Sequence, residues 1–434
     1  MFVPTVSGHV RAQSCVTLVV TRASVGFSHS ATIQAAVDEA KPCDLVLVAP
    51  GIYRRSVVIR TPHLRVRGLD RGRVVLDGGH RPGNGIEVRA DDVWIENLTV
   101  RNFDRRSLND EETGNEIRWR GVHGWHGNYL TVYDTGTLGG YGLYAEAAID
   151  GEWDRVYASG FNDSGLYVGA CRDCEATISH ALAERNAYGY AGTNSGGHLV
   201  VEDSTFRDNT IGLSANSSLS DPPPPQLGTC DGGANRLATP TIGSTGVARC
   251  TIFRRNRIID NDNLTAPANT SSGRPGAGIG IALLGAYADL VSDNVIAGNR
   301  NVGILALELP YRRPRRPRPV HFQLSGNRLA DNVVRGSRFS ILLEGGLFGS
   351  RRSVNNCFSD NHYARSLPAD LAPFDCAHAT TPNPSRQVSR LILRVVAALH
   401  ARLVSRRPRP QPAPPPQPTM PDPCAGAPAN PLCP

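Results

Sequence analysis

Residues 142–190 read GLYAEAAIDGEWDRVYASGFNDSGLYVGACRDCEATISHALAERNAYGY, and one short pattern returns in this stretch three times. A glycine followed by an apolar residue stands at Gly142-Leu143, Gly165-Leu166 and Gly189-Tyr190, at steps of 23 and 24 residues. Steps of 21 and 23 residues extend the series to Gly121-Val122 and Gly212-Leu213, and Gly280-Ile281 and Gly303-Ile304 are again 23 apart. Gly85-Ile86 belongs to the same series, with an insertion after it. A fixed period of this size is the signature of a repeat fold. It predicts that residues about 23 positions apart lie above one another, with Leu143, Leu166 and Leu213 in one buried row.

A second series supports the first. Asparagines five residues apart follow predicted strands at Asn97/Asn102, Asn256/Asn261, Asn294/Asn299, Asn327/Asn332 and Asn356/Asn361. Asparagine tolerates turn conformations and bonds to nearby backbone groups. In a solenoid such residues would stack from coil to coil and join their amides in a ladder.

The step of about 23 residues fits a coil of three short strands and three turns, with the strands of successive coils paired in parallel. The open ends of such a stack need covers, because unpaired strands invite aggregation. A short helix at Thr32–Ala40 is placed to cap the first coil. Residues 386–404 form an amphipathic helix, for which three roles remain: capping the last coil, lying on an anionic membrane surface, or being only marginally stable.

The chain divides into four parts. Residues 1–30 lack a period and read as an irregular leader, 31–376 carry the repeats, 377–405 are a linker with the amphipathic helix, and 406–434 are Pro-rich and expected to be disordered. No transmembrane span is predicted. The apolar run Val16–Val20 is too short for the core of a signal peptide. An extracellular or cell-envelope location is therefore inferred from the cysteines and the fold type.

Ten cysteines are present. Several are spaced in pairs across irregular segments, as disulfides in an oxidising compartment are. The candidates are Cys230 with Cys250, Cys357 with Cys376, and Cys424 with Cys433. Cys171 and Cys174 could be half of a zinc site, but no second pair of this type completes it, so a disulfide or two free thiols is favoured.

The basic residues are almost all arginine, since Lys41 is the only lysine among the 46 basic side chains. A GC-rich coding sequence explains this bias; an anion-binding surface is the alternative, because arginine grips carboxylates with two parallel hydrogen bonds. Aromatic and basic residues do not interleave as they do in nucleic-acid-binding proteins, so no nucleic-acid partner is expected.

The chain resembles bacterial right-handed parallel β-helix repeat proteins of the pectin-lyase-like superfamily. The resemblance rests on TIQAAVDEAKPCDLVLVAPGIY (32–53), LRVRGLD (64–70), VWIENLTVRNF (93–103), YASGFNDSGLYVGACRDC (157–174) and AERNAYGYAGTNSGG (183–197). It implies an all-β, single-stranded right-handed parallel β-helix over about residues 31 to 376. It does not imply a reaction, because this fold carries lyases, hydrolases, epimerases and proteins without catalysis.

Strand alternation predicts which side chains point outward from the repeat. The residue two after each repeat glycine gives an outer column, and a second column lies two residues further on. Polar, aromatic and titratable members gather in the N-terminal half, namely Glu87, His123, Tyr144 and Tyr167, flanked by Arg89, Trp125 and Glu146. Such a face suits a saccharide; alternatively, it is exposed stacking that only stabilises adjacent coils.

The superfamily members that act on uronic acids use a base to remove the proton beside the carboxylate, which calcium or arginine neutralises. The resemblance therefore implies Tyr144, His123 or Tyr167 as acid or base and Arg155 or Arg89 as neutraliser. Trp125, Glu146, Arg89 and Glu87 are the expected substrate contacts. The insertion Asp104–Trp119 carries Asp110, Glu111, Glu112 and Glu116, a cluster that suits Ca²⁺ if it is not simply a solvated acidic loop.

Two functions follow as hypotheses. The first is a secreted or cell-surface protein, expected to be monomeric, that binds extended polysaccharide or a cell-surface glycan along this face. The second is a polysaccharide lyase or epimerase acting on uronic-acid-containing glycans. The first is preferred, because no complete catalytic constellation stands out. A polygalacturonase-type hydrolase is disfavoured, since the only adjacent Asp pair is Asp91-Asp92 and no Gly-His-Gly occurs.

Overall fold

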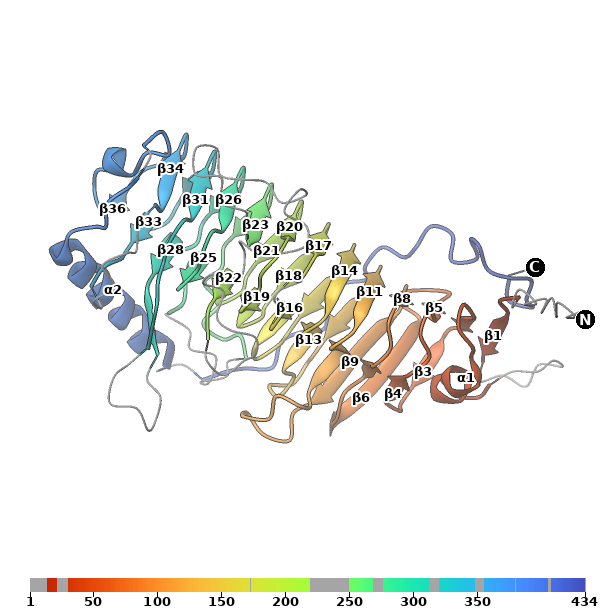
Figure 1. Cartoon of the computed structure of the whole chain (residues 1–434). Helices are drawn as coiled ribbons and strands as arrows, with labels where there is room; N and C mark the ends of the chain where they lie inside the picture. The colour runs from red at the N-terminus through yellow and green to blue at the C-terminus, as the bar shows by residue number, and fades with distance from the viewer. Residues whose placement is uncertain are drawn as a thin grey trace, which may run out of the picture.

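The computed structural model describes residues 14–21, 30–171, 173–218, 250–267, 276–311, 320–347, 355–378, 380–404 and 407–433. In these residues the chain winds into a stack of coils whose strands form three long parallel sheets (Figure 1). The right-handed parallel β-helix predicted from the sequence is confirmed. Among the described residues, no helix is both long and apolar enough to cross a bilayer.

Sheet A has twelve described strands. They are β1 (Thr17–Val20), β2 (Leu45–Val48), β5 (Arg65–Gly68), β8 (Val93–Glu96), β11 (His123–Asn128), β14 (Ile149–Asp154), β17 (Ala176–Ser179), β20 (Leu199–Glu202), β23 (Thr251–Arg254), β26 (Leu290–Ser292), β31 (Arg328–Ala330) and β34 (Cys357–Ser359).

Sheet B has eleven described strands and follows sheet A within each coil. They are β3 (Gly51–Tyr53), β6 (Val74–Pro82), β9 (Thr99–Asp104), β12 (Thr131–Tyr133), β15 (Tyr157–Ser159), β18 (Leu182–Glu184), β21 (Thr205–Arg207), β24 (Arg257–Ile259), β27 (Val295–Ala297), β32 (Val333–Arg335) and β35 (His362–Tyr363).

Sheet C completes the coil, also with eleven described strands. They are β4 (Val57–Ile59), β7 (Ile86–Val88), β10 (Asn115–Arg120), β13 (Tyr141–Glu146), β16 (Ser164–Gly169), β19 (Tyr188–Thr193), β22 (Ile211–Asn216), β25 (Ile279–Leu284), β28 (Val302–Leu307), β33 (Phe339–Leu343) and β36 (Ser366–Leu367). A small antiparallel hairpin, β29 (Leu309–Tyr311) and β30 (Val320–Phe322), projects from the stack.

The buried row predicted from the glycine steps is present. Leu143 pairs with Leu166, Leu166 with Tyr190, and Tyr190 with Leu213, and all four side chains are fully buried. The repeat glycines are needed because backbone and core side chains press against them. A Cβ on Gly142 would lie 2.4 Å from the carbonyl oxygen of Gly165.

The asparagines form ladders, as expected, but in three turns instead of one shared register. One ladder runs from Ser204 through Asn256, Asn294 and Asn332 to Asn361, at the turn from sheet A to sheet B. A second runs through Asn186, Asn209, Asn261 and Asn299, at the turn from B to C. A third joins Asp289, Asn327 and Asn356, at the turn from C to A. The two asparagines of a ladder pair, five residues apart, thus lie in two successive turns of the coil.

Both ends of the stack are covered. Helix α1 (Ile33–Glu39) adds Ile33, Ala36 and Val37 to the core of the first coil, and Thr32 caps it by accepting a hydrogen bond from the Ala35 nitrogen. At the other end, the 3₁₀ helix Ala372–Phe374 and the preceding Leu371 add apolar side chains to the same core. The leader predicted over residues 1–30 is corrected in one respect: Thr17–Val20 is the strand β1, parallel to β2.

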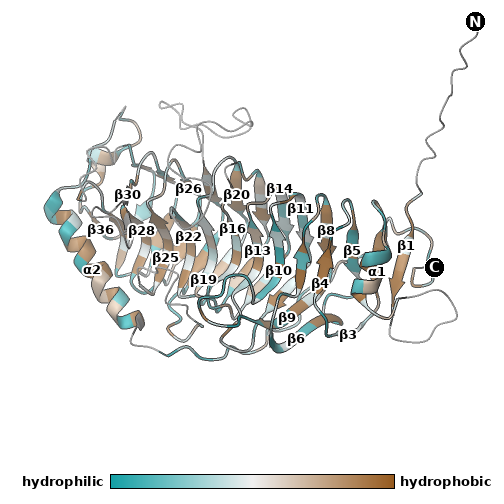
Figure 2. Cartoon of the chain, turned by 60° about the horizontal axis from the view of Figure 1, so that its bottom comes forward, coloured by the Kyte–Doolittle hydropathy of each residue, from teal (hydrophilic) through white to brown (hydrophobic). Residues whose placement is uncertain are grey.

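Helix α2 (Arg386–Val404) is present as predicted, with apolar residues along one side (Figure 2). Its buried Ile392 and Leu399 join the apolar outer face of sheet C that β25, β28 and β33 provide. The Ser389 hydroxyl donates to the Gly345 carbonyl oxygen at 3.1 Å. The helix therefore covers the side of the last coils, and it is the 3₁₀ segment that closes their end.

The Pro-rich tail differs from the disorder that its composition favours, because residues 407–433 run back along the solenoid toward the N-terminal coils (Figure 1). Near α2, the Arg409 nitrogen donates to the Thr265 carbonyl oxygen at 3.0 Å. Far along the stack, the Pro423 and Ala425 carbonyl oxygens accept from Arg67 on β5.

Four disulfides join described cysteines: Cys15–Cys43, Cys171–Cys174, Cys357–Cys376 and Cys424–Cys433. The first ties β1 to the coil and was not among the sequence candidates. The pairing of Cys171 with Cys174 settles the choice against a zinc half-site. Cys250 is also disulfide-bonded, while Cys230 of the proposed pair lies outside the described residues.

Candidate functional site

The outer face of sheet C is defined by its register. The column runs through Val58, Glu87, Arg118, Tyr144, Tyr167 and Ala191 on consecutive strands from β4 to β19. It continues through Ser214 on β22 and then through aliphatic residues to Leu342. The aliphatic end lies under α2. The polar end, over β4, β7 and β10, is the part of the column that remains open.

Two predicted members of this face lie elsewhere. His123 and Trp125 belong to β11 of sheet A, where they pair with Ile149 and Gly151. Trp125 is fully buried in the core, with its ring centroid 4.8 Å from that of Trp153. The place assigned to His123 is taken by Arg118, which lies between Glu87 and Tyr144. Neither His123 nor Trp125 can therefore contact a ligand on sheet C.

Tyr144 and Tyr167 do lie side by side on sheet C, with ring centroids 5.0 Å apart. Tyr141 stacks on Tyr144 at 4.2 Å, and both predicted tyrosines are only about one twentieth exposed, at 4% and 5%. Their rings pack against neighbouring side chains and do not form an open platform on which a sugar could stack.

The open part of the face contains a groove, with a volume of about 310 Å³. Three adjacent sheet-C strands form its floor and the insertion after β9 forms one wall. Its charged lining consists of Arg89, Arg106, Arg118, Arg120, Glu87 and Glu112. Four arginines and two glutamates line the groove, and two carboxylates outside the lining, Glu146 and Asp110, also pair with these arginines.

Arg118 organises this groove from its floor. The guanidinium is almost completely buried, and it donates to Glu112 at 3.0 Å and to Glu146 at 2.6 Å. It also lies over the Tyr144 ring, 5.2 Å from the centroid. These partners keep the pKa of Arg118 above its ordinary value despite burial, which by itself lowers it. Arg118 was missed in the sequence because it falls inside the assumed insertion.

The other arginines of the groove are more accessible. Arg120 donates to Glu112 at 2.9 Å and pairs with Glu146 at 3.5 Å, and about half of its side chain is exposed. Arg89 pairs with Glu87 at 2.9 Å with a similar exposure. The predicted substrate contacts Arg89, Glu87 and Glu146 therefore do come together here.

Arg155, the other predicted neutraliser, is not part of the groove. It sits in the turn between β14 of sheet A and β15 of sheet B, where it pairs with Asp154 and lies over the Tyr129 ring. That turn is at a different corner of the coil from sheet C, so Arg155 is excluded from a site that includes Tyr144.

The predicted calcium ligands of the insertion do not converge either. Asp110 accepts from Thr113 and pairs with Arg106, and Glu112 is held by Arg118 and Arg120. These contacts keep the pKa of both carboxyl groups below the ordinary range. Among the described residues, the ligand-type side chains that do converge are His80, Asp104 and Asp134, at the turn from sheet B to sheet C. Their signal in the sequence is weak, because each simply lies near the end of a sheet-B strand.

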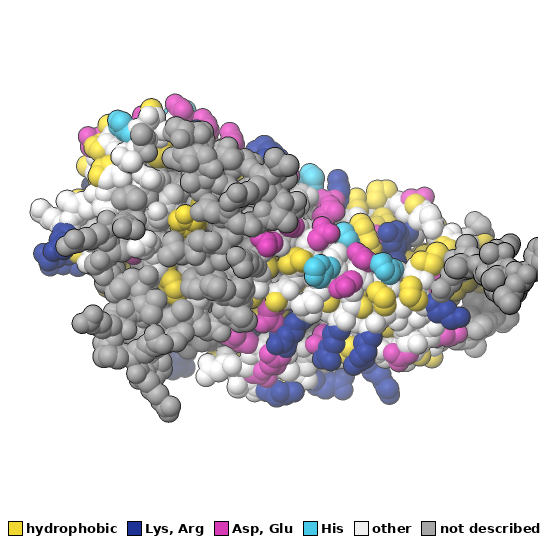
Figure 3. All heavy atoms as spheres, viewed as in Figure 1, with side chains coloured by type: hydrophobic (Ala, Val, Ile, Leu, Met, Phe, Trp, Pro, Cys, Tyr) yellow, Lys and Arg dark blue, Asp and Glu magenta, His cyan; other side chains and the backbone are white. Residues whose placement is uncertain are grey.

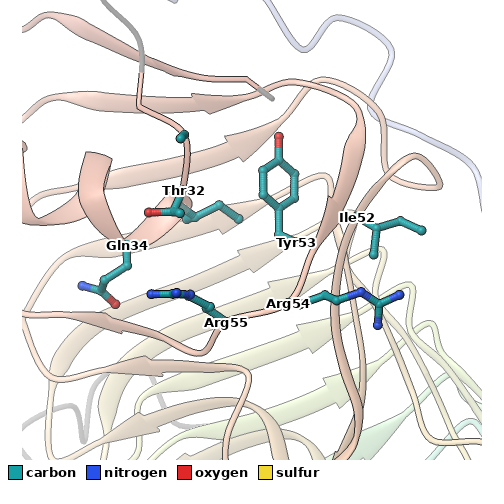
Figure 4. Close-up of a pocket in the computed structure, with 8 residues that line it drawn as sticks. Thr32, Gln34, Ile52, Tyr53, Arg54 and Arg55 are labelled. Carbon is teal, nitrogen blue, oxygen red and sulfur yellow. The ribbon is translucent and has the colours of Figure 1, made fainter. Parts of the chain in front are cut away.

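A second hollow, of about 260 Å³, lies between α1 and β3 at the N-terminal end (Figure 4). Its lining includes Thr32, Gln34, Tyr53, Arg54 and Arg55. Gln34 donates to the Val58 carbonyl oxygen and accepts from the Val58 nitrogen, which fixes the cap to the first coil. The hollow is thus part of the capping contact.

Arginines are interspersed with acidic side chains over the N-terminal half of the face that Figure 3 shows. Several bridge neighbouring coils through Glu or Asp, such as Arg67 with Glu96, Arg207 with Glu184, and Arg254 with Glu202. Many of the arginines therefore join neighbouring coils. In the groove on sheet C, several arginines also line a hollow.

Comparison with known proteins gives structural likenesses only. No family model matches the chain, and no curated protein matches it. Similar solved structures are the A-module of the mannuronan C-5 epimerase AlgE4 of Azotobacter vinelandii (14% identity, 76% of this chain and 90% of that one, TM-score 0.41) and an alginate lyase of a Paenibacillus species (13%, 76% and 96%, 0.36). A mannuronic acid specific polysaccharide family 6 lyase from human gut microbiota is also similar (15%, 76% and 80%, 0.44). Likenesses this remote agree with the fold and assign no residue of the groove.

Proposed function

We propose that the chain is a secreted or cell-surface protein that binds an acidic polysaccharide in the sheet-C groove. The observation that carries the proposal is the groove itself, in which Arg89, Arg118 and Arg120 line one open hollow. Guanidinium groups bind carboxylates with paired hydrogen bonds, so a uronic-acid-containing glycan is the chemical class that fits. The disulfides support an oxidising compartment outside the cytoplasm.

The shape of the groove supports an extended ligand. Its floor spans three coils, and since neighbouring parallel strands lie about 4.8 Å apart, this corresponds to about 10 Å along the axis. A chain laid along the axis would pass Arg89 and Arg120 in turn. Both ends of the stack are covered, which removes the strand edges through which copies would pair, so the proposed working unit is a monomer.

The test is binding of the full chain to polygalacturonate and alginate, with dextran as the neutral glycan, measured by calorimetry. We expect binding to the two polyuronates, weakened by salt as the charges are screened. The double variant Arg89→Ala/Arg120→Ala should lower the affinity at least about tenfold, equal to about 1.4 kcal/mol. The matched control is Arg257→Ala, an exposed arginine on sheet B. Equal binding of dextran, or equal losses in both variants, would contradict the proposal.

A second candidate function is a lyase or epimerase on the same glycans. The observation that favours it is the contact of the Tyr144 ring with the guanidinium of Arg118, which lies on the floor of the groove and donates to Glu146. In such a reaction Arg118 would neutralise the uronate and Tyr144 would exchange the proton. Incubation with polyuronates should then give an unsaturated product that absorbs in the ultraviolet, or proton exchange at C5, and Tyr144→Phe should abolish either signal while Tyr188→Phe does not.

A further inference from the structure

A separate polar cluster lies at the corner where sheet B turns into sheet C. His80 lies near the end of β6, Asp104 ends β9 and Asp134 follows β12, so three successive coils each contribute one side chain. The His80 Nδ1 atom is 3.4 Å from Asp104 Oδ1 and 3.5 Å from Asp134 Oδ1. One ligand atom from each of the three residues lies within 4.8 Å of the others.

The charges of this cluster do not balance. Asp104 and Asp134 are buried, and behind them Glu116 is completely buried on β10. Glu116 Oε1 accepts from the Phe103 nitrogen, whereas Oε2 has no hydrogen-bond partner among the described residues. Glu116 stands where neighbouring coils have the repeat glycine, so its side chain enters the corner instead of solvent. Asp104 and Asp134 therefore share one imidazole, and Glu116 adds a further buried carboxyl group close to them.

The nearby arginines are engaged elsewhere, since Arg101 pairs with Asp77 and Arg105 directs its guanidinium to Asp163 and the Tyr141 ring.

The orientation of the imidazole is set by its other nitrogen. The Thr135 hydroxyl donates to Asn102 Oδ1, an oxygen that also accepts from the Thr135 backbone nitrogen. That hydroxyl can therefore only accept from His80, whose Nε2 lies 3.2 Å away and must carry the hydrogen. With the hydrogen on Nε2, the lone pair of Nδ1 points at two carboxylates, and a cation bound between them would satisfy all three groups.

We propose that His80, Asp104 and Asp134 bind a divalent transition-metal ion, with Zn²⁺ or Mn²⁺ as the class that fits. Ligand atoms bound at about 2.1 Å in a tetrahedron are about 3.4 Å apart, which matches the two separations from Nδ1. An imidazole ligand suits these metals, whereas Ca²⁺ and Mg²⁺ take oxygen ligands. About two fifths of the His80 side chain is exposed, which leaves an open position for water or a ligand oxygen.

The carboxylate of Asp134 is fixed for this role. Its two oxygens accept from the Gly136 and Gly139 backbone nitrogens at 2.9 and 2.7 Å, so it keeps its position whether or not an ion is bound. The bound ion would join three coils at the corner that leads into the groove, because Gly83 and Thr113, which line the groove, belong to the turns that follow His80 and Asp104.

The test is calorimetric titration of the chelator-treated full chain with ZnCl₂, MnCl₂ and CaCl₂ at pH 7.5. We expect one Zn²⁺ or Mn²⁺ site per chain, with affinity for Ca²⁺ at least 100-fold lower. His80→Ala should weaken the binding at least 100-fold. This variant should still fold, because the His80 side chain is exposed. The matched control is His180→Ala, since His180 is an exposed histidine that pairs with the carboxylate of Asp154.

A second measurement separates this site from a simple ion pair. Saturating Zn²⁺ should raise the melting temperature of the wild type and of His180→Ala, but not that of His80→Ala or Asp134→Asn. Unchanged Zn²⁺ affinity in His80→Ala would overturn the proposal. The proposal would also be overturned if the wild type takes up no ion and His80→Ala lowers the melting temperature only at acidic pH. His80 would then act as a protonated partner of the aspartates.

Discussion

The side-chain oxygen of Asn97 accepts a hydrogen bond at 2.8 Å from the backbone nitrogen of Met420, which lies 323 residues later in the chain. The same oxygen accepts from the Thr419 hydroxyl, which in turn accepts from the Arg71 nitrogen. The amide nitrogen of Asn97 donates to the Gly68 carbonyl oxygen. At this turn the tail thus supplies the donors to the asparagine oxygen that the preceding coil supplies in the asparagine ladders.

Removal of residues 407–434 should therefore destabilise the N-terminal coils. Arg71 is buried, which lowers its pKa to about 10, and it would lose the Pro418 carbonyl oxygen as an acceptor. Arg67 would lose two carbonyl acceptors. Leaving buried polar groups without partners costs about 1–3 kcal/mol each. We expect a lower melting temperature, with faster amide exchange in β5 and β8 than in β28 and β33.

The point variant Thr419→Val provides the control for this truncation. It removes only the hydroxyl, so it should cost about 1 kcal/mol and leave most of the tail in place. If the truncated chain melts like the full chain and exchanges uniformly along the solenoid, the tail contacts contribute nothing to stability.

The core beneath the groove allows a second prediction. The indole of Trp125 lies directly against Gly151 on the next coil, and a Cβ on this glycine would clash with the ring at 1.8 Å from Cε2. Gly151→Ala should force the Trp125, Trp119 and Trp153 cluster apart and cost about 1–3 kcal/mol. Gly72→Ala is the control, because the nearest atom to its Cβ is a side-chain oxygen 3.6 Å away. Urea denaturation measures both, and similar small losses would contradict close packing at Gly151.

The fold was predictable because the repeat glycines report a steric requirement shared by most of the coils. The groove was predictable only in part, since the glycine step fails in the coil that carries Arg118. There Glu116 replaces the glycine, while Gly121-Val122 imitates the pattern after the strand has ended. Because the repeat was aligned on Gly121 instead of Glu116, the prediction assigned His123 and Trp125 to the sheet-C face and omitted Arg118. The positions of His80, Asp104 and Asp134 depend on turns of unequal length, and the periodicity of the strands does not predict how such turns bring side chains together.

The asparagine ladder gives a third prediction. Asn294 accepts from the backbone and amide nitrogens of Asn256, and its own amide donates to Asn332 and to the Phe253 carbonyl oxygen. Asn294→Ala would leave several of these buried groups unpaired, for an expected loss of about 2–4 kcal/mol. Asn361→Ala, at the partly exposed end of the same ladder, should cost less. Equal losses of the free energy of unfolding in the two variants, measured by urea denaturation, would contradict a larger contribution from the interior of the ladder.

The last prediction concerns pH. Burial, together with the charge of Glu308, raises the pKa of Glu344 to about 7, from an ordinary value near 4.5. Between these two values the folded chain binds more protons than the unfolded chain. The contribution of Glu344 to the free energy of unfolding is therefore full below about pH 4.5 and is lost as the pH rises through about 7. Stability should fall across this interval.

Glu344→Gln isolates the contribution of this one group. Glutamine keeps an oxygen for the Glu308 backbone nitrogen, which donates to Glu344 at 3.0 Å, and it carries no charge. At pH 8 the variant should be more stable than the wild type by about 1–3 kcal/mol, whereas at pH 4 the two should be nearly equal. The exposed Glu39→Gln should change neither value. A variant whose stability follows the same pH curve as the wild type would mean that Glu344 ionises freely in the folded chain.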